Sequence, residues 1–354
     1  MRPDYKTLAG VFFLILIFSA GNYYIFSRLN LWLSLGLNWR SCVAGAFLGG
    51  FAFIVIIWHP FSVKSLYHIA AYWFGFILIT FIVFIAGDII AIMLPVQQGY
   101  LGMAALFISL CITVYSVSNN LSGRRVENIK LASPKITNPI RIVLIADTHI
   151  SRFHSAEYLA GIAVEINRQE PDIVCISGDF ADGETDFSAI EPLNEIRAPV
   201  YLVMGNHEVW HNHNGEIEKL LSRTGVTILK NEKTRGIRLI GVHFKNGRHV
   251  LKDAFETIKL DTSEYNILLY HEPAEVEVAR EAGIDLMLSG HTHGGQIFPW
   301  NYFTKLVYNY FKGLYTFKGM SIYVSQGTGV WGPPMRLGSH NEITVIDVEP
   351  GTIH

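Results

Sequence analysis

The sequence has little cysteine and no excess of charge of either sign. Its 354 residues include three cysteines, and none of them has the Cys-x-x-Cys spacing of a zinc ribbon or a redox motif. Lysine and arginine number 28 against 30 aspartate and glutamate, which gives a formal net charge of −2. These figures argue against a disulfide framework and against the basic patch of a nucleic-acid-binding protein.

Charge is also nearly absent from residues 1–118, whereas the rest of the chain has the mixed composition of a globular domain. Four apolar segments follow one another in the first part: 8–26, 42–58, 69–94 and 100–117. Each approaches the ~20 residues that a helix needs to cross a bilayer. The alternative is a signal peptide followed by buried core helices. Four consecutive segments almost without charge favour an all-α transmembrane bundle of about four helices over residues 1–120.

Lysine and arginine near the segment ends predict the orientation of this bundle. Seven of them flank the ends on the side of the N-terminus, and two, Arg28 and Arg40, lie in the first loop on the opposite side. Because cytoplasmic loops are enriched in Lys and Arg, we expect the N-terminus and the C-terminal domain in the cytoplasm. The chain is then an integral protein of the bacterial inner or plasma membrane.

One carboxylate, Asp88, falls inside the third apolar segment. A charge in the hydrocarbon core is unfavourable, so a residue of this kind is often functional. Pro95 follows closely, and the segment is longer than a span requires. Both features favour a position near the helix end, or a hydrogen bond to a neighbouring Ser or Tyr.

A linker is predicted over residues 121–138, and an α/β domain over residues 139–354. In this domain, short apolar runs alternate with loops and helical patterns. Five of the runs are predicted strands: 141–147, 172–179, 199–207, 265–271 and 284–291. Because they are apolar along their length, we expect them to be buried on both faces, in a sheet covered by helices.

Each predicted strand ends at aspartate or histidine. Ligands bind outside the carboxyl ends of strands in open α/β sheets, so these ends place metal-ligating side chains at one sheet edge. The candidates are Asp147, His149, Asp179, Asp182, Asn206, His207, His271, His291 and His293. Oxygen and nitrogen ligands without thiolates suit Mn²⁺, Fe²⁺ or Zn²⁺ better than Ca²⁺. This number of ligands exceeds what one ion needs, and so we predict two metals.

Glycine stands directly before three of these ligand positions, at Gly178, Gly205 and Gly290. A residue without a side chain allows a tight turn there. It also allows backbone and ligands to crowd around the metals.

The ordered blocks Asp-x-His, Gly-Asp-x-x-Asp, Gly-Asn-His-Glu, a lone His and Gly-His-x-His resemble the calcineurin-like metallophosphoesterases over about residues 139–349. The resemblance implies a four-layer α/β/β/α sandwich with two metals between the sheets. It implies one metal held by Asp147, His149, Asp179 and His293, and another held by Asp179, Asn206, His271 and His291. It further implies that His207, oriented by Asp182, protonates the leaving alkoxide or stabilises the transition state.

Residues 289–300 and 313–348, after a multi-span apolar half, resemble more narrowly the subfamily called transmembrane protein with metallophosphoesterase domain. Some bacterial relatives of that group are linked to UDP-2,3-diacylglucosamine diphosphatase activity in lipid A synthesis. The resemblance therefore implies a pyrophosphate or phosphodiester bond on a nucleotide-lipid or phospholipid substrate. We expect Mn²⁺ as the metal, with Fe²⁺ or Zn²⁺ as alternatives.

Two features near the C-terminus have alternative interpretations. Arg336 either pairs with a substrate phosphate through both guanidinium edges or holds the C-terminal strand in place. The aromatic-rich residues 296–311 either form a hydrophobic rim that faces a membrane or an acyl chain, or pack as an insertion on their own domain.

The leading hypothesis from the sequence is a membrane-anchored, two-metal phosphohydrolase acting on a lipid-linked substrate. One alternative is a phosphodiesterase for a soluble diester such as a cyclic nucleotide. Another is a membrane scaffold without catalysis, although the full set of expected ligands weighs against it. No nucleic-acid partner is expected, and the sequence carries no signal for an oligomeric state.

Overall fold

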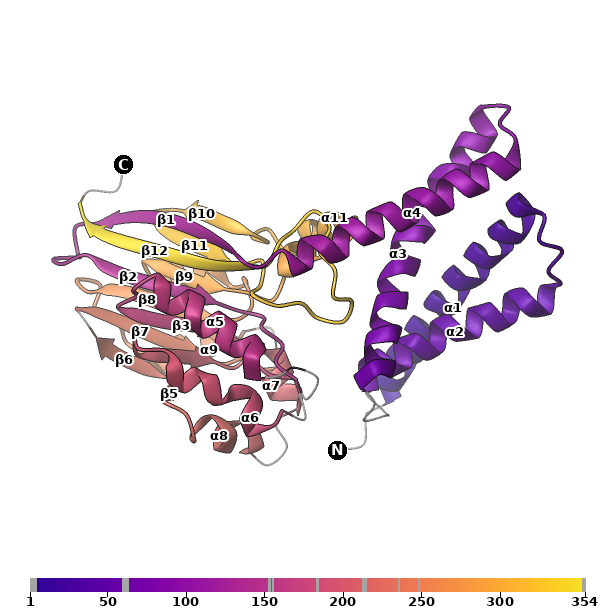
Figure 1. Cartoon of the computed structure of the whole chain (residues 1–354). Coiled ribbons are helices and arrows are strands. Elements are labelled where there is room, and N and C mark those ends of the chain that lie inside the picture. The colour runs from indigo at the N-terminus through magenta and orange to yellow at the C-terminus, as the bar shows by residue number, and fades with distance from the viewer. Residues whose placement is uncertain are drawn as a thin grey trace. The chain divides into compact units, whose positions relative to one another are not determined.

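The computed structural model describes residues 5–58, 64–151, 154, 156–182, 185–211, 215–234, 236–247 and 249–351. The chain divides into two compact units (Figure 1). One unit contains the first 122 residues together with Gly332–Arg336, and the other contains Gly123–Trp331 and the residues from Leu337 onward.

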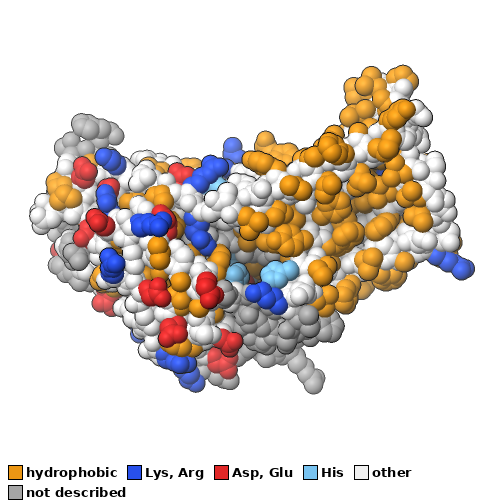
Figure 2. Space-filling model, in the orientation of Figure 1, with side chains coloured by type: hydrophobic (Ala, Val, Ile, Leu, Met, Phe, Trp, Pro, Cys, Tyr) orange, Lys and Arg blue, Asp and Glu red, His pale blue; other side chains and the backbone are white. Residues whose placement is uncertain are grey.

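The helical unit consists of α1 (Tyr5–Leu33), α2 (Trp39–Trp58), α3 (Lys64–Met93) and α4 (Gln98–Leu121). The four predicted apolar segments coincide with these helices. Among the described residues, α3 and α4 are long and apolar enough to cross a membrane. Hydrophobic side chains cover much of the visible surface of these helices (Figure 2), as in a lipid-facing surface. The count of four spans stays a prediction.

Asp88, inside α3, is paired with two side chains of α1. The Tyr24 hydroxyl donates a hydrogen bond of 2.6 Å to Asp88 Oδ2, and Arg28 Nε lies 2.9 Å from the same oxygen. The expected hydrogen bond from a tyrosine to Asp88 is therefore confirmed. The assignment of Arg28 and Arg40 to the first loop is wrong, because α1 continues to Leu33 and α2 begins at Trp39. A paired carboxylate between two helices suits a structural role for Asp88.

The second unit is built on two six-stranded sheets, in the orders β1-β12-β2-β3-β4-β5 and β10-β11-β9-β8-β7-β6. The strands of the first sheet are β1 (Arg125–Ser133), β12 (Glu342–Pro350), β2 (Ile140–Ile145), β3 (Ile173–Ser177), β4 (Val200–Val203) and β5 (Val226–Ile228). Those of the second are β10 (Gly313–Phe317), β11 (Met320–Val324), β9 (Leu286–Ser289), β8 (Tyr265–Tyr270), β7 (Ile237–Val242) and β6 (Asn231–Thr234). The central pairs β2–β3, β3–β4, β7–β8 and β8–β9 are parallel.

Helices cover the outer face of each sheet, and their bounds are α5 (Ala156–Arg168), α6 (Phe187–Ile190), α9 (Val250–Thr257) and α10 (Val276–Ala282). Successive residues of a strand point to opposite faces. In β2, Val143 packs in the core that includes α5, whereas Leu144 packs in the core between the sheets. In β8, Leu269 lies between the sheets and Leu268 packs with α9 and α10. The layers run helix, sheet, sheet, helix, which agrees with the metallophosphoesterase fold expected from the sequence.

The prediction of a linker over residues 121–138 is wrong, because this range contains β1. The strand runs parallel to β12, with Arg125 opposite Glu342. β1 lies at the edge of its sheet and most of its side chains are exposed or half-buried. Such a strand carries polar residues, so it lacks the apolar run by which the central strands were recognised.

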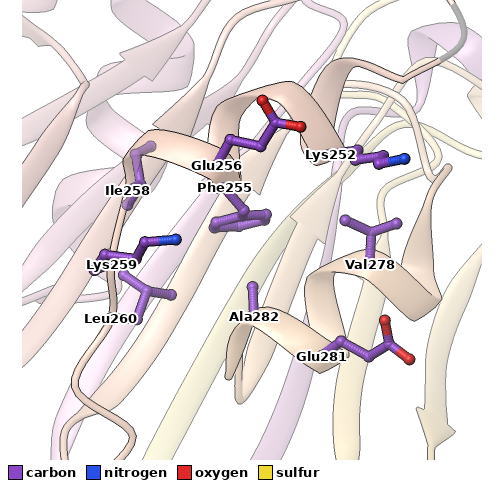
Figure 3. A pocket seen from close by; sticks show the side chains of 9 residues that line it. All are labelled: Lys252, Phe255, Glu256, Ile258, Lys259, Leu260, Val278, Glu281 and Ala282. Carbon is purple, nitrogen blue, oxygen red and sulfur yellow. The ribbon is translucent and has the colours of Figure 1, made fainter.

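A pocket of about 450 Å³ lies beside α9 and α10 (Figure 3). Phe255 and Leu260 line it together with charged residues such as Lys252 and Glu281. None of its lining residues is a predicted metal ligand, so this pocket is separate from the candidate site.

Candidate metal centre

The strand ends of both sheets carry the nine predicted side chains into one cluster. From the first sheet, Asp147 and His149 follow β2, Asp179 and Asp182 follow β3, and Asn206 and His207 begin the short helix α7 (Asn206–His211) after β4. From the second sheet, His271 follows β8, His291 follows β9, and His293 begins the turn η3 (His293–Gly295). Three overlapping groups among them have ligand atoms close enough to hold a metal ion.

The backbone at five of these positions is left-handed. The φ angles are 52° at Asp147, 50° at His149, 48° at Asp179, 71° at His291 and 50° at His293. Residues other than glycine seldom adopt this region, and each instance costs on the order of 1–3 kcal/mol. Strain of this kind persists where the surrounding structure enforces it, which is typical of functional sites.

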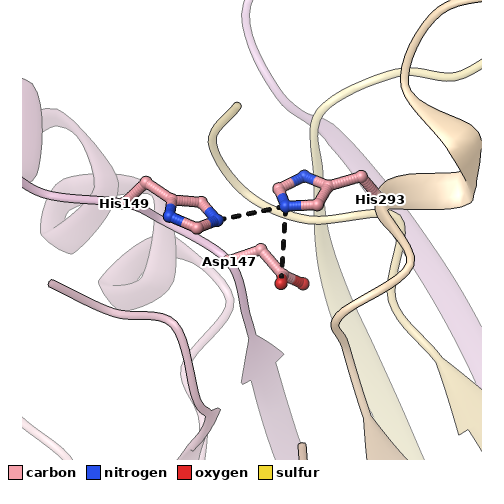
Figure 4. A group of neighbouring side chains, drawn as sticks. All are labelled: Asp147, His149 and His293. Atoms are coloured by element: carbon pink, nitrogen blue, oxygen red, sulfur yellow. Dashed lines mark hydrogen bonds and ion pairs between the residues drawn. The ribbon is translucent and has the colours of Figure 1, made fainter. Parts of the chain in front are cut away.

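The first metal-binding group is formed by Asp147, His149 and His293 (Figure 4). His149 Nε2 lies 3.1 Å from His293 Nε2, and His293 Nε2 lies 3.6 Å from Asp147 Oδ1. Two donor atoms that are each about 2.1 Å from one ion lie roughly 3.0–3.4 Å apart. The observed spacing therefore fits a divalent cation between these side chains.

Another group is formed by Asp179, His271 and His291, and Asn206 lies against it. The remaining group, His149, Asp179 and His207, joins the other two. His271 Nε2 lies 3.1 Å from both Asp179 Oδ2 and Asn206 Oδ1. His291 Nδ1 lies 2.9 Å from Asn206 Oδ1 and 3.2 Å from His271 Nε2. These separations also fit one ion. Asp179 Oδ2 is in addition 4.0 Å from His149 Nε2, so this oxygen faces both groups.

Hydrogen bonds outside the two groups orient the imidazole rings. His271 Nδ1 donates to the Ser177 carbonyl at 2.7 Å, which leaves the lone pair of Nε2 directed toward the cluster. Asp182 Oδ1 lies 2.8 Å from His149 Nδ1 and 2.7 Å from His207 Nδ1. Partners of this kind fix the tautomer and the orientation of ligating histidines.

His207 lies at the margin of the cluster. Its Nε2 is 3.9 Å from Asp179 Oδ2, and its side chain is 13% exposed. The His271 side chain, by comparison, is fully buried. The His207 side chain is therefore more accessible to solvent than that of His271.

The buried charges shift the pKa values of the cluster strongly. Burial alone would lower the pKa of His149 and of His271, but neighbouring carboxylates, chiefly Asp182 and Asp179, raise these values to about 9 and about 10. Burial raises the pKa of Asp147 to about 6. Without a bound cation, protons on the histidines compensate for the negative charge of the carboxylates. A bound divalent cation takes the place of those protons.

Sequence comparison agrees with this geometry. Residues 140–295 match the profile of a family described as Calcineurin-like phosphoesterase. An uncharacterized metallophosphoesterase of Aquifex aeolicus is 31% identical over 244 residues, which cover 64% of this chain and 92% of that protein. The chain belongs to the calcineurin-like phosphoesterase family. Family membership and the clustered ligands together identify a metal-dependent phosphoesterase that binds divalent cations.

Two further relatives of this metallophosphoesterase differ in how much of their length is matched. An uncharacterized metallophosphoesterase of Campylobacter jejuni is 27% identical over 364 residues, covering 96% of this chain and 97% of that protein. A protein of Bos taurus named transmembrane protein with metallophosphoesterase domain is 33% identical over 237 residues, covering 60% and 53%. The chain thus spans about half the length of the bovine relative.

Glu208 of the metallophosphoesterase cluster had no role in the sequence interpretation. Its buried carboxylate accepts backbone hydrogen bonds from Asp179 at 3.0 Å, Ala181 at 2.8 Å and Gly205 at 2.7 Å. It therefore joins the turn after β3 to the turn after β4. A local signal was present, because a glutamate three residues after an N-cap reaches back to the N-cap amide.

Two other supporting residues had no sequence signal. The Tyr308 hydroxyl lies 2.8 Å from His291 Nε2. His243, just after β7, accepts a hydrogen bond of 3.0 Å from the backbone of Met204. Both act across long sequence separations, and neither belongs to a recognised block.

The glycines before the ligands are required by the crowding that the sequence predicted. A Cβ at Gly178, where φ is +83°, would lie 2.7 Å from Gly205 N and from His271 Nδ1. A Cβ at Gly290 would collide with the Asp147 carboxylate. The expectation of close approach at these two positions is confirmed.

Arg336 is grouped with a different unit from the proposed metal ligands. It lies in the segment grouped with the helical unit, where its backbone N–H donates to the Ser116 carbonyl at 3.0 Å and its carbonyl accepts from the Asn119 amide at 2.9 Å. Its side chain is fully buried. A contact between Arg336 and a substrate phosphate stays a prediction.

Proposed function

We propose that this metallophosphoesterase is anchored in a membrane and hydrolyses a phosphodiester or pyrophosphate bond of a lipid-linked substrate such as UDP-2,3-diacylglucosamine. The observation that carries the reaction is the pair of ligand groups that meet at Asp179. Two adjacent cations are suited to a phosphoryl centre, because they stabilise both the attacking and the leaving oxygen.

The two groups divide the proposed ligands between two metals. Asp147, His149, Asp179 and His293 hold one, and Asp179, Asn206, His271 and His291 hold the other. Bound divalent cations lower the pKa of water and neutralise charge on the phosphoryl group. Mn²⁺ is the metal we propose, and the same nitrogen and oxygen ligands also accept Fe²⁺ or Zn²⁺.

His207 is the proposed general acid. Its Nδ1 lies 2.7 Å from Asp182 Oδ1, a contact that holds the ring with Nε2 3.9 Å from Asp179 Oδ2. As a water oxygen forms a new bond to phosphorus and the bond to the leaving oxygen breaks, the proton on His207 Nε2 would pass to the leaving oxygen, and the proton lost by the water would return to the solvent. Asp182 holds the ring in position during the transfer, and the exposure of His207 admits the substrate.

The lipid part of the proposal rests on the helical unit. Helices α3 and α4 are long enough to span a bilayer, and one relative is named a transmembrane protein. An active site that is anchored to a membrane encounters lipid substrates that diffuse within the same membrane. This arrangement suits an enzyme of lipid A biosynthesis. The lysine and arginine distribution supports a bacterial inner-membrane location with the catalytic unit in the cytoplasm.

The test is phosphorus release from UDP-2,3-diacylglucosamine and from a bis-aryl phosphate, in detergent with Mn²⁺. The comparison is wild type against Asp179→Asn, because Asp179 faces both metal groups. Turnover of both substrates that is lost in the variant supports the proposal.

Other outcomes separate the chemistry from the substrate. Turnover of the aryl diester alone retains the two-metal reaction and rejects the lipid substrate, which leaves a soluble diester such as a cyclic nucleotide. Turnover of neither substrate with Mn²⁺, Fe²⁺ or Zn²⁺ rejects the enzyme proposal in favour of a scaffold.

A further inference from the structure

Helix α11 (Trp300–Val307) exposes an apolar surface beside the metal centre. None of its eight residues is buried, and Leu306 and Val307 are 83% and 74% exposed. We use the name α11 surface for six exposed side chains: Phe298, Trp300, Tyr302, Phe303, Leu306 and Val307. Among the described residues of the two-sheet unit, only four other large hydrophobic side chains are exposed, at Val164, Trp210, Leu314 and Trp331, and none of them by more than 53%. The exposure is therefore concentrated in one short stretch.

The sequence that contains the α11 surface carries cations and no acids. From residue 286 to residue 341 the sequence contains no aspartate or glutamate, although the chain has 30 of them. The same stretch contains Lys305 and Lys312, as well as Lys318, which pairs with Glu277 at 3.0 Å, and the buried Arg336. Lys305 lies within α11 itself and is exposed. Aromatic and aliphatic side chains mixed with a cation and without acids are typical of helices that lie in the interface of anionic membranes.

The α11 surface is attached to the metal centre on its C-terminal side. Tyr308, directly after the helix, bonds to His291, and the Phe311 carbonyl accepts a hydrogen bond of 2.6 Å from Thr292 Oγ1. On its N-terminal side, α11 begins seven residues after His293. Whatever the α11 surface contacts is therefore held next to the proposed ligands.

The segment that connects the two units is short. Only Ser122, Gly123 and Arg124 separate the end of α4 from the start of β1. Three linking residues span at most about 10–14 Å. If α4 crosses a membrane, the two-sheet unit begins at that membrane, and an interfacial helix on this unit meets lipid at high local concentration.

We propose that the α11 surface docks on the lipid bilayer interface beside the active site. Its apolar side chains enter the boundary between headgroups and acyl chains, and Lys305 contacts anionic headgroups. The proposal rests on the membrane anchoring in the proposed function and is independent of the reaction. It assigns the aromatic stretch a partner, a phospholipid surface.

The test places a probe on the α11 surface of the full-length protein in nanodiscs of phosphatidylcholine and phosphatidylglycerol. Leu306→Cys carries a polarity-sensitive fluorophore, in a background where the exposed Cys111 is replaced by Ala. Cys42 and Cys175 are buried, so they stay. The matched control is Val164→Cys on α5, an exposed apolar position at 47%. Emission is read with and without nitroxide-labelled lipids.

We expect blue-shifted emission and strong lipid quenching at position 306, and neither at position 164. Lys305→Gln is expected to lower the docked fraction about fivefold in discs with phosphatidylglycerol, and little in discs of phosphatidylcholine alone. Equal, weak quenching at both positions overturns the proposal. So does a blue-shifted label at 306 that lipid quenchers do not reach, which indicates a protein partner such as a second copy. Because no turnover is needed, failure of the proposed reaction leaves these readouts unchanged.

Discussion

The hydroxyl of Tyr308 lies 2.8 Å from Nε2 of His291. The other ring nitrogen, Nδ1, faces Asn206 Oδ1 at 2.9 Å and is the atom proposed to bind a metal. With Nδ1 on a metal, the proton is on Nε2, which then donates to the tyrosine oxygen. Tyr308 thereby sets both the tautomer and the rotation of a proposed metal ligand.

Tyr308→Phe is expected to weaken metal binding about tenfold to a hundredfold, because the ring of His291 loses the partner that orients it. Competition with a chelating dye measures this change directly. Tyr310→Phe is the control, because Tyr310 packs through its ring against Tyr315 and Phe317. Equal affinity in the two variants contradicts an orienting role for Tyr308.

Asp182 supports two histidines with different proposed roles, and its replacement separates them. Asp182→Asn is expected to reduce kcat by about a hundredfold to ten-thousandfold, since His207 loses the carboxylate that holds its ring in position. It also weakens metal binding through His149, whose Nδ1 bonds to the same oxygen. His207→Asn is expected to lose a similar factor in kcat with its metal content intact. Metal loss from His207→Asn would indicate that His207 is a ligand.

Glu208 is expected to contribute to stability more than to catalysis. Glu208→Ala leaves three buried backbone N–H groups without an acceptor, and each such donor costs about 1–3 kcal/mol. We expect a loss of roughly 3–5 kcal/mol in the free energy of unfolding, measured by denaturant titration followed through tryptophan emission. Glu256→Ala, on the surface of α9, is the control and should change stability by less than about 0.5 kcal/mol. If Glu208→Ala lowers the free energy of unfolding no more than the control does, Glu208 does not stabilise the site.

The central strands of the two sheets and the ligands that follow them were predictable, because both are determined by short stretches of sequence. β2, β3, β4, β8 and β9 are apolar runs that are each followed within four residues by Asp or His. The same short stretch of sequence therefore indicates both the strand and its ligand. β7 is equally buried, but no ligand follows it in a known block, and it went unrecognised. β1 went unrecognised because it is an edge strand whose side chains are partly polar.

The support of the ligands was less predictable, because it depends on contacts between distant segments. The bond from Met204 to His243 joins the ends of β4 and β7, in different sheets. Its existence follows from how the two sheets pack, which no single stretch of sequence specifies. Glu208 is the exception, since its position after Gly205 carries a capping signal.

Replacement of Gly178 by alanine tests whether the turn before Asp179 tolerates a side chain. Gly178→Ala places a Cβ against Gly205 N and His271 Nδ1 and forces alanine into a left-handed backbone. We expect loss of metal binding and a lower unfolding midpoint. Gly161→Ala is the matched control, because nothing lies within 4 Å of its Cβ position on α5. That change should stabilise the protein by about 0.5–1 kcal/mol. Normal metal content in Gly178→Ala would show that the turn has room to move.

Metal binding is expected to release protons. In the metal-free protein the pKa values of His149 and His271 are about 9 and about 10, so both rings are charged near neutral pH. Ligation requires the neutral ring, and about two protons therefore leave per protein when the metals bind. Metal affinity rises with pH until both groups have titrated. The heat of Mn²⁺ binding, measured in two buffers of different ionisation enthalpy, gives the proton count.

The same shifts set how the stability of the metal-free protein depends on pH. A histidine with a raised folded pKa contributes stability that is complete below its unfolded pKa of about 6.5. That contribution is lost as pH rises through about 9 for His149 and about 10 for His271. The unfolding midpoint of chelator-treated protein should therefore fall across this range, whereas that of the metal-loaded protein should not. A midpoint that is flat in pH for both forms, with binding heats independent of buffer, would mean that these histidines are neutral before metal arrives.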